Sequence, residues 1–303
     1  MPLNSLNFRS VLRCLVLVAA LLTIAAKAQQ PTLSPLATIS VGVGPGPIAV
    51  DSSSDVAYVV NTGANSVSAI STKTLKVSKV IAVGAAPVAI ATDLGLGMVY
   101  VANSGDGTVS AIKGTAASTW HIGGTPGPMV ADTFLSHLYV ADTTGNQVVV
   151  LNSKTGAVLA SLPTTLTPTA MALNPATHAV FVANTGASGS VVVIDGVHDQ
   201  IVTTIGSLPV GATSISVAPQ TNISFVAFNA GNALSIIDAA NGYAVNTVTN
   251  VGGVQILFGC QVDVGNPYLT AYDSTHQSFL FSGGPFLFFG DDMAEFGLDN
   301  FWG

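Results

Sequence analysis

A unit of about 42 residues recurs through most of this chain of 303 residues. Each copy begins with a turn rich in Gly, Pro or Thr, followed by a short apolar run. These openings are VGVGPGPIAV at 41, VGAAPVAIA at 83, IGGTPGPMVA at 122, TTLTPTAMAL at 164 and a weaker PVGATSISVA at 209. An aromatic residue then follows at Tyr58, Tyr100, Tyr139, Phe181 and Phe225, with spacings of 42, 39, 42 and 44 residues. A fixed period of this size predicts one supersecondary unit in each copy.

The second half of each copy keeps an equally constant register. A Val or Leu follows the aromatic residue at offsets of 9, 9, 9, 10 and 9, and an Ile or Leu comes three residues later. Each copy therefore predicts four short antiparallel strands separated by turns. Because residues of both strand faces are largely apolar, each sheet must be covered on both sides, which a radial arrangement of sheets provides. The sequence thus predicts an all-β fold, a β-propeller of four-stranded antiparallel blades.

The glycine-rich opening at residues 42–47 has a competing interpretation as a phosphate-binding loop. A dinucleotide loop needs G-x-G-x-x-G between a strand and a helix, whereas here the pattern precedes a strand-like run. A Walker loop needs Gly-Lys-Ser/Thr, and no lysine lies between Lys27 and Lys73. We therefore expect residues 42–47 to form the tight entry into the innermost strand of the first unit.

The repeats resemble a known family. Tyr58-Val59-Val60-Asn61 and Tyr100-Val101-Ala102-Asn103, with V-S-x-I and V-G-x-x-P after them, resemble the YVTN family of β-propeller repeats from residue 37 to about 250. NHL-type propeller repeats are similar. The match is looser where Asp142 or Phe228 replaces the asparagine. The resemblance implies the propeller fold, usually with seven blades.

The chain ends suggest how the ring closes. Residues 36–42 look like an outer strand without inner partners, and residues 253 to about 281 supply three further strands. Joining them predicts a six-bladed ring, with a seven-bladed ring as the alternative. The propeller would span 29–282. Residues 283–303, rich in aromatic and acidic side chains, break the repeat, and we expect a final strand and a tail packed on one face; disorder or a partner-docking segment are the alternatives.

The N-terminal segment has the pattern of a secretory signal peptide. Arg9 and Arg13 precede an apolar run, and Ala26-Lys27-Ala28 offers a cleavage site before Gln29. A membrane anchor is the alternative, but the run of about 13 residues is short for a span of about 20. We therefore predict that residues 1–28 are removed, that the protein is periplasmic or extracellular, and that no membrane span remains.

The predicted mature chain is acidic. It has five basic and 15 acidic residues, a net charge of −10, so we expect no nucleic acid partner. Cys260 is its single cysteine, which excludes an internal disulfide and a c-type haem. We expect a monomer with a protein or glycan partner.

Two sets of polar residues recur at strand ends. Asn61, Asn103, Asp142 and Asn184 could form a ring of ligands, but we expect each to bond the backbone of its own turn. A calcium site is the competing interpretation of Asp51 and Asp55, yet the D-x-D-x-D-G spacing is absent, and a turn explains them better.

The histidines form no metal motif. His137 and His178 lie two and three residues before an aromatic residue, which suggests a repeated surface position, and His121 and His198 complete no H-x-x-x-H pair. The single glutamate, Glu295, lies near the C-terminus, and no G-x-S-x-G occurs. The sequence therefore assigns no catalytic, cofactor-binding or metal-binding residue, and no cofactor.

Two functions remain. The first is an exported, non-enzymatic binding or scaffold module that acts through its blade loops. The alternative is a lactonase-like or other metal-assisted hydrolase, motivated by the family resemblance and by Asp51, Asp93 and Asp132 near inner-strand ends. The resemblance is incomplete, because the glutamate of gluconolactonase-type propellers and the basic residues of phosphogluconolactonase-like rings have no match. Acids that converge on the channel would favour the hydrolase.

Overall fold

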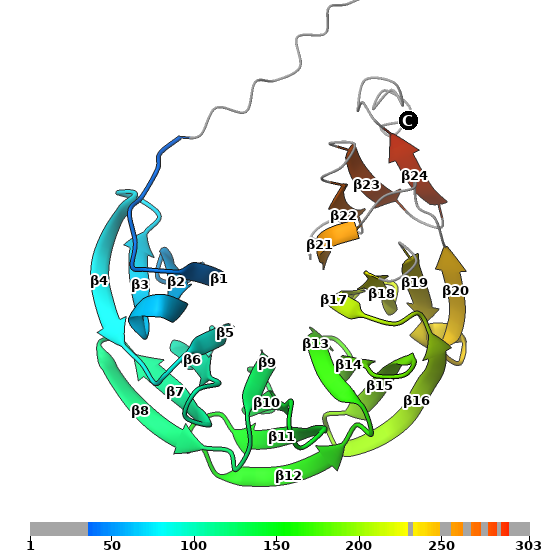
Figure 1. Cartoon of the computed structure of the whole chain (residues 1–303), viewed down its shortest axis with the longest axis horizontal. Helices are drawn as coiled ribbons and strands as arrows, with labels where there is room; N and C mark the ends of the chain where they lie inside the picture. Colours follow the sequence, from blue (N-terminus) through cyan, green and yellow to red (C-terminus); the bar gives the residue numbers. More distant parts are fainter. Residues whose placement is uncertain are drawn as a thin grey trace, which may run out of the picture. The chain divides into compact units, whose positions relative to one another are not determined.

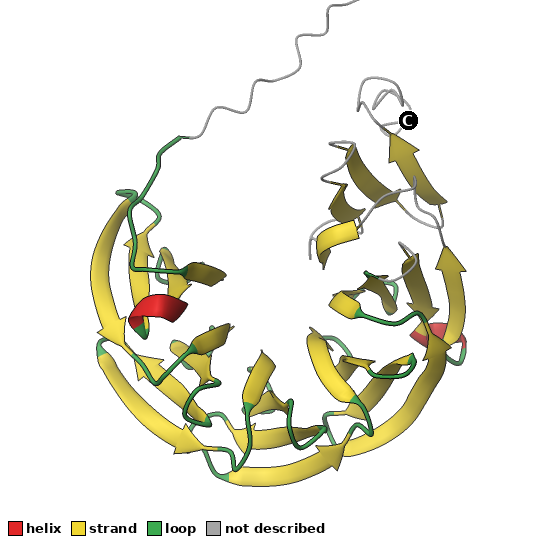
Figure 2. Cartoon of the chain, in the orientation of Figure 1, coloured by secondary structure: helices red, strands yellow, loops and turns green. Residues whose placement is uncertain are grey.

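The described residues are almost entirely β-strand. The structure, a computed structural model, describes residues 36–229, 233–248, 256–262, 268–273, 278–283 and 286–290. The chain divides into two units, Met1–Thr38 with Gly297–Gly303, and Ile39–Phe296, which holds every described strand. Only two short 3-10 helices interrupt the described strands, η1 (Thr62–Ala64) and η2 (Ala239–Asn241) (Figure 2). The all-β prediction is confirmed, and the predicted signal peptide, residues 1–28, lies outside the described residues.

The strands form six sheets of four, each in chain order and antiparallel throughout. The first three sheets contain β1 (Pro45–Asp51), β2 (Val56–Asn61), β3 (Ser66–Ser71), β4 (Lys76–Ala82); β5 (Pro87–Asp93), β6 (Met98–Asn103), β7 (Thr108–Lys113), β8 (Ala116–His121); β9 (Pro126–Asp132), β10 (His137–Asp142), β11 (Gln147–Asn152), β12 (Val158–Pro163). The last three contain β13 (Thr167–Asn174), β14 (Ala179–Thr185), β15 (Gly189–Asp195), β16 (Gln200–Leu208); β17 (Ala212–Ala218), β18 (Ile223–Phe228), β19 (Ala233–Asp238), β20 (Ala244–Val248); β21 (Ile256–Val262), β22 (Tyr268–Asp273), β23 (Ser278–Gly283), β24 (Phe286–Gly290). The four-stranded unit predicted from the repeat is confirmed.

The sheets pack one on the next in chain order. The first strand of each sheet is innermost, and these strands contact one another in succession from β1 through β5, β9, β13 and β17 to β21 (Figure 1). The core lies between neighbouring sheets. Tyr100 and Val109 of the second sheet, for example, share one buried cluster with Met129 and Leu138 of the third. Both faces of an interior sheet are therefore covered, as the apolar pattern requires.

The glycine-rich opening forms the entry into β1, as predicted. The carbonyl of Val43 accepts the N–H of Gly63 at 3.0 Å, and that of Gly44 accepts the N–H of Thr62 at 2.9 Å. Gly44 has a positive φ of 64°, which favours glycine. These bonds hold the segment against the corner after β2. Residues 36–42 consequently form no strand, so the prediction that they complete the last sheet is wrong.

The last sheet takes its fourth strand from the C-terminal segment instead. β24 (Phe286–Gly290) pairs with β23, with Phe288 opposite Phe281 in register. The final strand expected within residues 283–303 is therefore confirmed, whereas the predicted joining of the two chain ends in one sheet is not observed. The remainder of that segment, from 291 onward, lies outside the described residues.

Candidate functional site

The recurrent asparagines at the ends of β2 and β6 bind the next strand. Asn61 Nδ2 donates to Ser66 Oγ at 3.2 Å and Ser68 Oγ at 3.0 Å, and Asn103 bonds Ser110 Oγ in the same way at 2.9 Å. These partners are hydroxyl groups, so the expectation of backbone bonds is wrong for both. Within the described residues their buried Oδ1 atoms have no hydrogen-bond partner.

Asp142, the counterpart in the third sheet, does bind its turn backbone as expected. Its Oδ1 accepts the N–H groups of Thr125, Thr144 and Gly145 at 3.0 to 3.2 Å, and its Oδ2 accepts from Gln147 Nε2. Burial opposes ionisation, but these hydrogen bonds outweigh it and hold the pKa of Asp142 below its usual value. The carboxylate is thus fully engaged in closing a corner.

Glycines in the connectors between sheets make room for these side chains. A Cβ at Gly84 would lie 2.6 Å from Asn103 Nδ2, and one at Gly124 would lie 2.2 Å from the Asp142 carboxylate. In the second sheet the V-G-x-x-P and Y-V-x-N motifs are therefore linked, because Gly84 of the first leaves room for Asn103 of the second; in the third sheet the residue that makes room is Gly124, one position after the motif glycine.

The aspartates at the inner-strand ends close the first turn of their sheets. Asp51 Oδ1 accepts the N–H groups of Ser53 at 2.9 Å and Ser54 at 3.2 Å, which confirms its interpretation as a turn residue. Hydrogen bonds from the hydroxyls of Ser53 and Ser54 lower its pKa. Asp93 accepts the N–H of Leu96 at 3.1 Å in the next sheet. The carboxylates of Asp51 and Asp93 therefore accept hydrogen bonds from N–H groups of their own turns.

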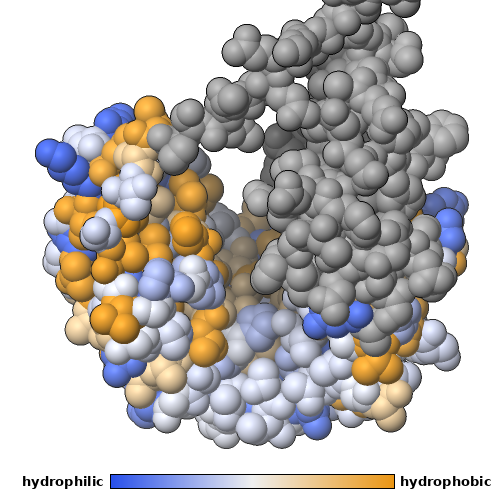
Figure 3. Space-filling view, turned by 45° about the horizontal axis from the view of Figure 1, so that its top comes forward, coloured by the Kyte–Doolittle hydropathy of each residue, from blue (hydrophilic) through white to orange (hydrophobic). Residues whose placement is uncertain are grey.

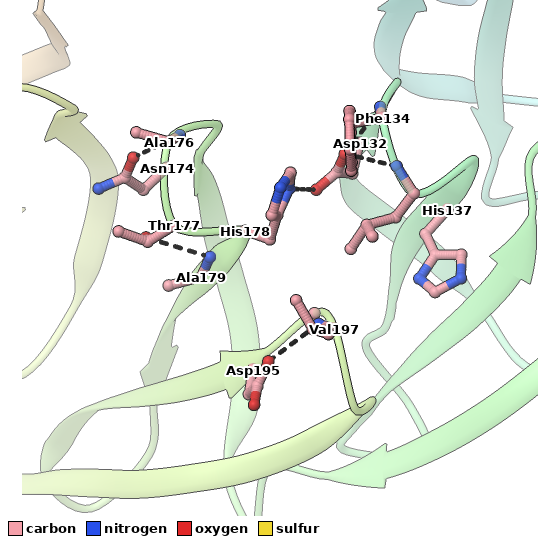
Figure 4. Close-up of polar contacts among 12 residues, drawn as sticks. Asp132, Phe134, His137, Asn174, Ala176, Thr177, His178, Ala179, Asp195 and Val197 are labelled. Carbon is pink, nitrogen blue, oxygen red and sulfur yellow. Dashed lines mark hydrogen bonds and ion pairs between the residues drawn. The ribbon is translucent and has the colours of Figure 1, made fainter.

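The closest His–Asp contact with a buried carboxylate joins the third and fourth sheets. Asp132, at the end of β9, is 2% exposed, and its Oδ2 lies 2.7 Å from Nδ1 of His178, the residue before β14 (Figure 4). Because an ionised carboxylate only accepts, Nδ1 carries the proton. Asp132 also accepts the N–H groups of Phe134 and Leu135, each at 3.0 Å. The Phe134 ring stacks on His178 with centroids 5.1 Å apart.

A second polar group lies at the same junction. Tyr139 Oη donates to the carbonyl of Gly196 at 3.3 Å, and His137 Nδ1 lies 3.3 Å from Tyr139 Oη and 3.4 Å from Asp199 Oδ1. Burial, followed by the charge of Asp199, raises the pKa of Tyr139, and burial raises the pKa of Asp199 itself. The side chains of His137 and His178 are only 17% and 19% exposed, so their prediction as surface positions is wrong.

The contact between Asp132 and His178 has a neutral counterpart at the next junction. There Asn174, at the end of β13, donates from Nδ2 to Asn222 Oδ1 at 2.7 Å. His178 and Asn222 both close the first turn of their sheet with positive φ, 60° and 56°, as Asp55, Gly97 and Ser136 do in other sheets. The left-handed backbone of His178 is therefore a requirement of the turn. Aligning the first turns of the repeats would have identified this pairing from the sequence.

The described residues contain no group of three or more His, Cys, Asp or Glu side chains arranged to hold a metal ion. In the same part of the chain no helix has the length and apolar character needed to cross a membrane.

The arrangement of sheets matches known structures. Similar solved structures include hydrazine synthase of Kuenenia stuttgartiensis, with a TM-score of 0.70 and 17% identity over 83% of this chain and 79% of that one. Another is the beta-propeller domain of Cps50 (Swd1) from Myceliophteria thermophila, with a TM-score of 0.68 and 10% identity over 85% and 87%. A family model described as "Lactonase, 7-bladed beta-propeller" matches residues 19–160.

The chain is a β-propeller. Its six sheets, β1–β4 to β21–β24, are called the first to sixth blades below. At these identities the structural likeness shows the fold alone. A comparison with curated proteins finds no significant match. The YVTN assignment and the number of blades in the closed propeller stay predictions.

One end of the propeller carries exposed apolar loop residues. In antiparallel blades the turn after the first strand and the turn after the third strand lie at the same end. Leu94 and Phe134, in first turns, are 46% and 82% exposed, and Val197, in a third turn, is 54% exposed. Phe134 is also the residue that stacks on His178. Loops positioned by a rigid scaffold carry the binding residues in many proteins.

Proposed function

We propose that this propeller is an exported, non-enzymatic binding module. The observation that carries the proposal is the equivalence of Asp132–His178 with Asn174–Asn222. The most enzyme-like pair in the described residues occupies positions that two amides fill at the next junction. Its role is thus to join blades rather than to move a proton. Export rests on the signal-peptide pattern of residues 1–28.

The proposed binding surface is the end that carries Leu94, Phe134 and Val197. These side chains come from turns of the second, third and fourth blades, so a ligand would span several blades. Phe134 is pre-organised by its stack on His178, whose ring Asp132 fixes, and a pre-organised aromatic group loses little entropy on binding. A protein or glycan partner fits this surface, because an acidic chain repels nucleic acid.

The test measures binding to arrays of immobilised glycans and of displayed peptides. We expect the native protein to bind a defined ligand, and Phe134→Ser to weaken that binding at least tenfold. Val158→Ser is the matched control, since Val158 is 54% exposed on the outer strand β12. If a variant with serine at Leu94, Phe134 and Val197 binds the ligand as tightly as the native protein, this end of the propeller is not the binding surface.

A hydrolase is the second candidate, favoured by the family model described as a lactonase propeller. His178 would be its general base, because Asp132 holds Nδ1–H and leaves Nε2 to activate water. A panel of lactones and esters tests it, together with melting temperatures measured with and without EDTA. Hydrolysis that falls about 100-fold or more in His178→Asn, with the fold intact, would replace the first proposal by this one.

A further inference from the structure

The charges around the proposed binding surface are ordered by sign. The third turn of each blade lies at this end of the propeller. In the first three blades this turn or its border carries an exposed lysine: Lys73, Lys113 and Lys154. In the fourth and fifth blades the same place carries partly exposed aspartates: Asp195, Asp199 and Asp238. The rim of this end is therefore basic over three blades and acidic over the next two.

Few other charges blur this division. No Lys or Arg occurs between Lys154 and the end of the chain, so the fourth and fifth blades have none. In the first three blades the inner-strand aspartates are at most 7% exposed, and Asp55 is paired with Lys73 at 2.5 Å. Charged residues make up only 8% of the chain, and Figure 3 shows that strongly hydrophilic residues are sparse on the visible side of the described blades. Among the described third turns, the sign changes at the junction of the third and fourth blades.

The exposed apolar side chains lie where the sign changes. The first turns of the second and third blades are in contact, because a Cβ added at Gly95 would overlap Thr133. The third turn of the fourth blade also reaches the third blade, because a Cβ at Gly196 would lie 3.4 Å from Leu135 Cδ1. Their neighbours in the chain are the three exposed apolar residues, Leu94, Phe134 and Val197. These three residues therefore belong to one continuous surface, with basic turns on one side and acidic turns on the other.

We propose that a second copy of the same protein binds this surface, in a twofold symmetric dimer. A twofold axis along the junction of the third and fourth blades places the third blade over the fourth blade of the second copy, and the second blade over its fifth. Lys154 then faces Asp195 of the second copy, and Lys113 faces Asp238 of the second copy. The dimer uses the binding surface proposed above, so it rests on that proposal and names the partner.

A second copy fits this surface better than a glycan or an unrelated protein. An isologous interface needs a patch that is complementary to itself, and a patch with one basic and one acidic half meets this condition. The apolar residues lie near the axis with charged groups around them, as in interfaces with an apolar core and a polar rim. A neutral glycan would leave both sets of charges unpaired. A dimer would replace the monomer expected from the sequence, since the order of the charges by turn emerges only from the fold.

Sedimentation of the purified protein over a range of protein and salt concentrations tests the dimer. We expect the dissociation constant to rise at least about tenfold between low salt and about 1 M salt, because salt screens the charge pairs at the rim. Lys154→Glu should raise it by at least about tenfold, since it places two acids opposite each other. Lys79→Glu makes the same change of charge on an exposed residue of β4, away from this end, and is the matched control.

A further set of variants separates loss of contact from structural damage. Asp195→Asn keeps the side-chain oxygen that accepts the N–H of Val197 but removes the charge. Combined with Lys154→Met, it should weaken dimerisation by less than the product of the two single fold-changes, because the two side chains face each other across the interface. Strictly multiplicative effects would mean that the two side chains do not meet, and would overturn this arrangement.

The remaining outcomes separate the dimer from the proposed function. A protein that stays monomeric at every concentration would overturn the dimer, and if it binds a glycan or a peptide through Phe134 the proposed function stands. A dimer that tolerates both Phe134→Ser and Lys154→Glu would be held together by another surface, which would also overturn the inference. A dimer that these two variants dissociate supports it, even where no ligand is found on the arrays.

Discussion

Two neighbouring blade junctions are joined at equivalent positions by side chains of different chemistry. The junction of the third and fourth blades uses a carboxylate and an imidazole, Asp132 and His178, while the next one uses Asn174 and Asn222. The donor–acceptor distance is 2.7 Å in both. A buried charge in this molecule therefore does not by itself mark an active site. Comparing the two junctions also gives the contribution of charge to stability, because the turn backbone at His178 and at Asn222 has nearly the same φ.

The largest expected effect comes from deleting the carboxylate. Asp132→Ala should lower the free energy of unfolding by about 2–4 kcal/mol, because it leaves His178 and two turn N–H groups without their acceptor. Asn174→Ala should cost about 1–2 kcal/mol, since only neutral bonds are lost. Urea denaturation of both variants measures the difference. Equal losses would mean that the charge contributes nothing at this junction.

Transplanting the neutral pair sharpens the comparison. Asp132→Asn and His178→Asn should each cost about 1–2 kcal/mol alone, because the first replaces an acceptor oxygen by an NH2 group and the second replaces the imidazole donor by a shorter side chain. The double variant reproduces the chemistry of Asn174 and Asn222, and we expect it to recover to within about 1 kcal/mol of the native protein. A double-mutant cycle gives this coupling. Strictly additive losses would show that the two junctions differ in geometry.

The aromatic positions of the two junctions differ by one hydroxyl. Tyr139 donates to Gly196, whereas the fourth blade has Phe181 at the same place in its repeat. Tyr139→Phe should cost about 1 kcal/mol, measured as a shift in the denaturation midpoint. Tyr100→Phe, which removes a shorter bond of 2.6 Å to Ser153, is the companion variant. If neither variant loses stability, the two tyrosines contribute to the fold through packing alone.

The smallest effect belongs to the exposed pair at the same junction. The hydrogen bond from His198 lowers the pKa of Asp195, so the pair stabilises the fold above the usual aspartate value of 3.8 and stops doing so as pH falls through the lower folded pKa. Solvent screens this partly exposed pair, and His198→Ala should cost under about 0.5 kcal/mol at pH 7. Thermal denaturation at a series of pH values below 3.8 should show that small difference vanish as Asp195 is protonated. A difference that persists after Asp195 has been protonated would contradict this assignment.

Strand positions could be predicted because they depend on local chemistry. Turn residues and apolar runs repeat with nearly constant spacing, so β2 and β6, for example, each start two residues before the aromatic residue that marks the predicted strand. The strand that completes the last blade could not be predicted in the same way. Residues 36–42 are β-prone, but hydrogen bonds with the corner after β2 hold the segment that follows, and the last blade takes β24 instead. Single-strand propensity does not encode that competition.

The contacts between blades could not be predicted strand by strand. Asp132 and His178 are 46 residues apart, and their meeting depends on how one blade sits on the next. The sequence pattern places Asp132 among the acids near inner-strand ends, but it matches His178 with His137, whereas the structure places Ser136 and Asn222 at the position of His178. Comparing turns across repeats, rather than searching for metal or catalytic motifs, would have revealed the pair. The glycine of the connector and the asparagine of the corner approach closely within one sheet, where the connector enters the first strand beside the end of the second.

The order in which neighbours touch also bears on when the protein can assemble. Each blade packs on the one that follows it in the chain, and the bond between Ser153 and Asp93 spans only 60 residues. The first junction can therefore form once the chain has been made as far as His121, the end of β8. Assembly can then advance one blade at a time during synthesis, because each new blade packs on a blade that has already been made.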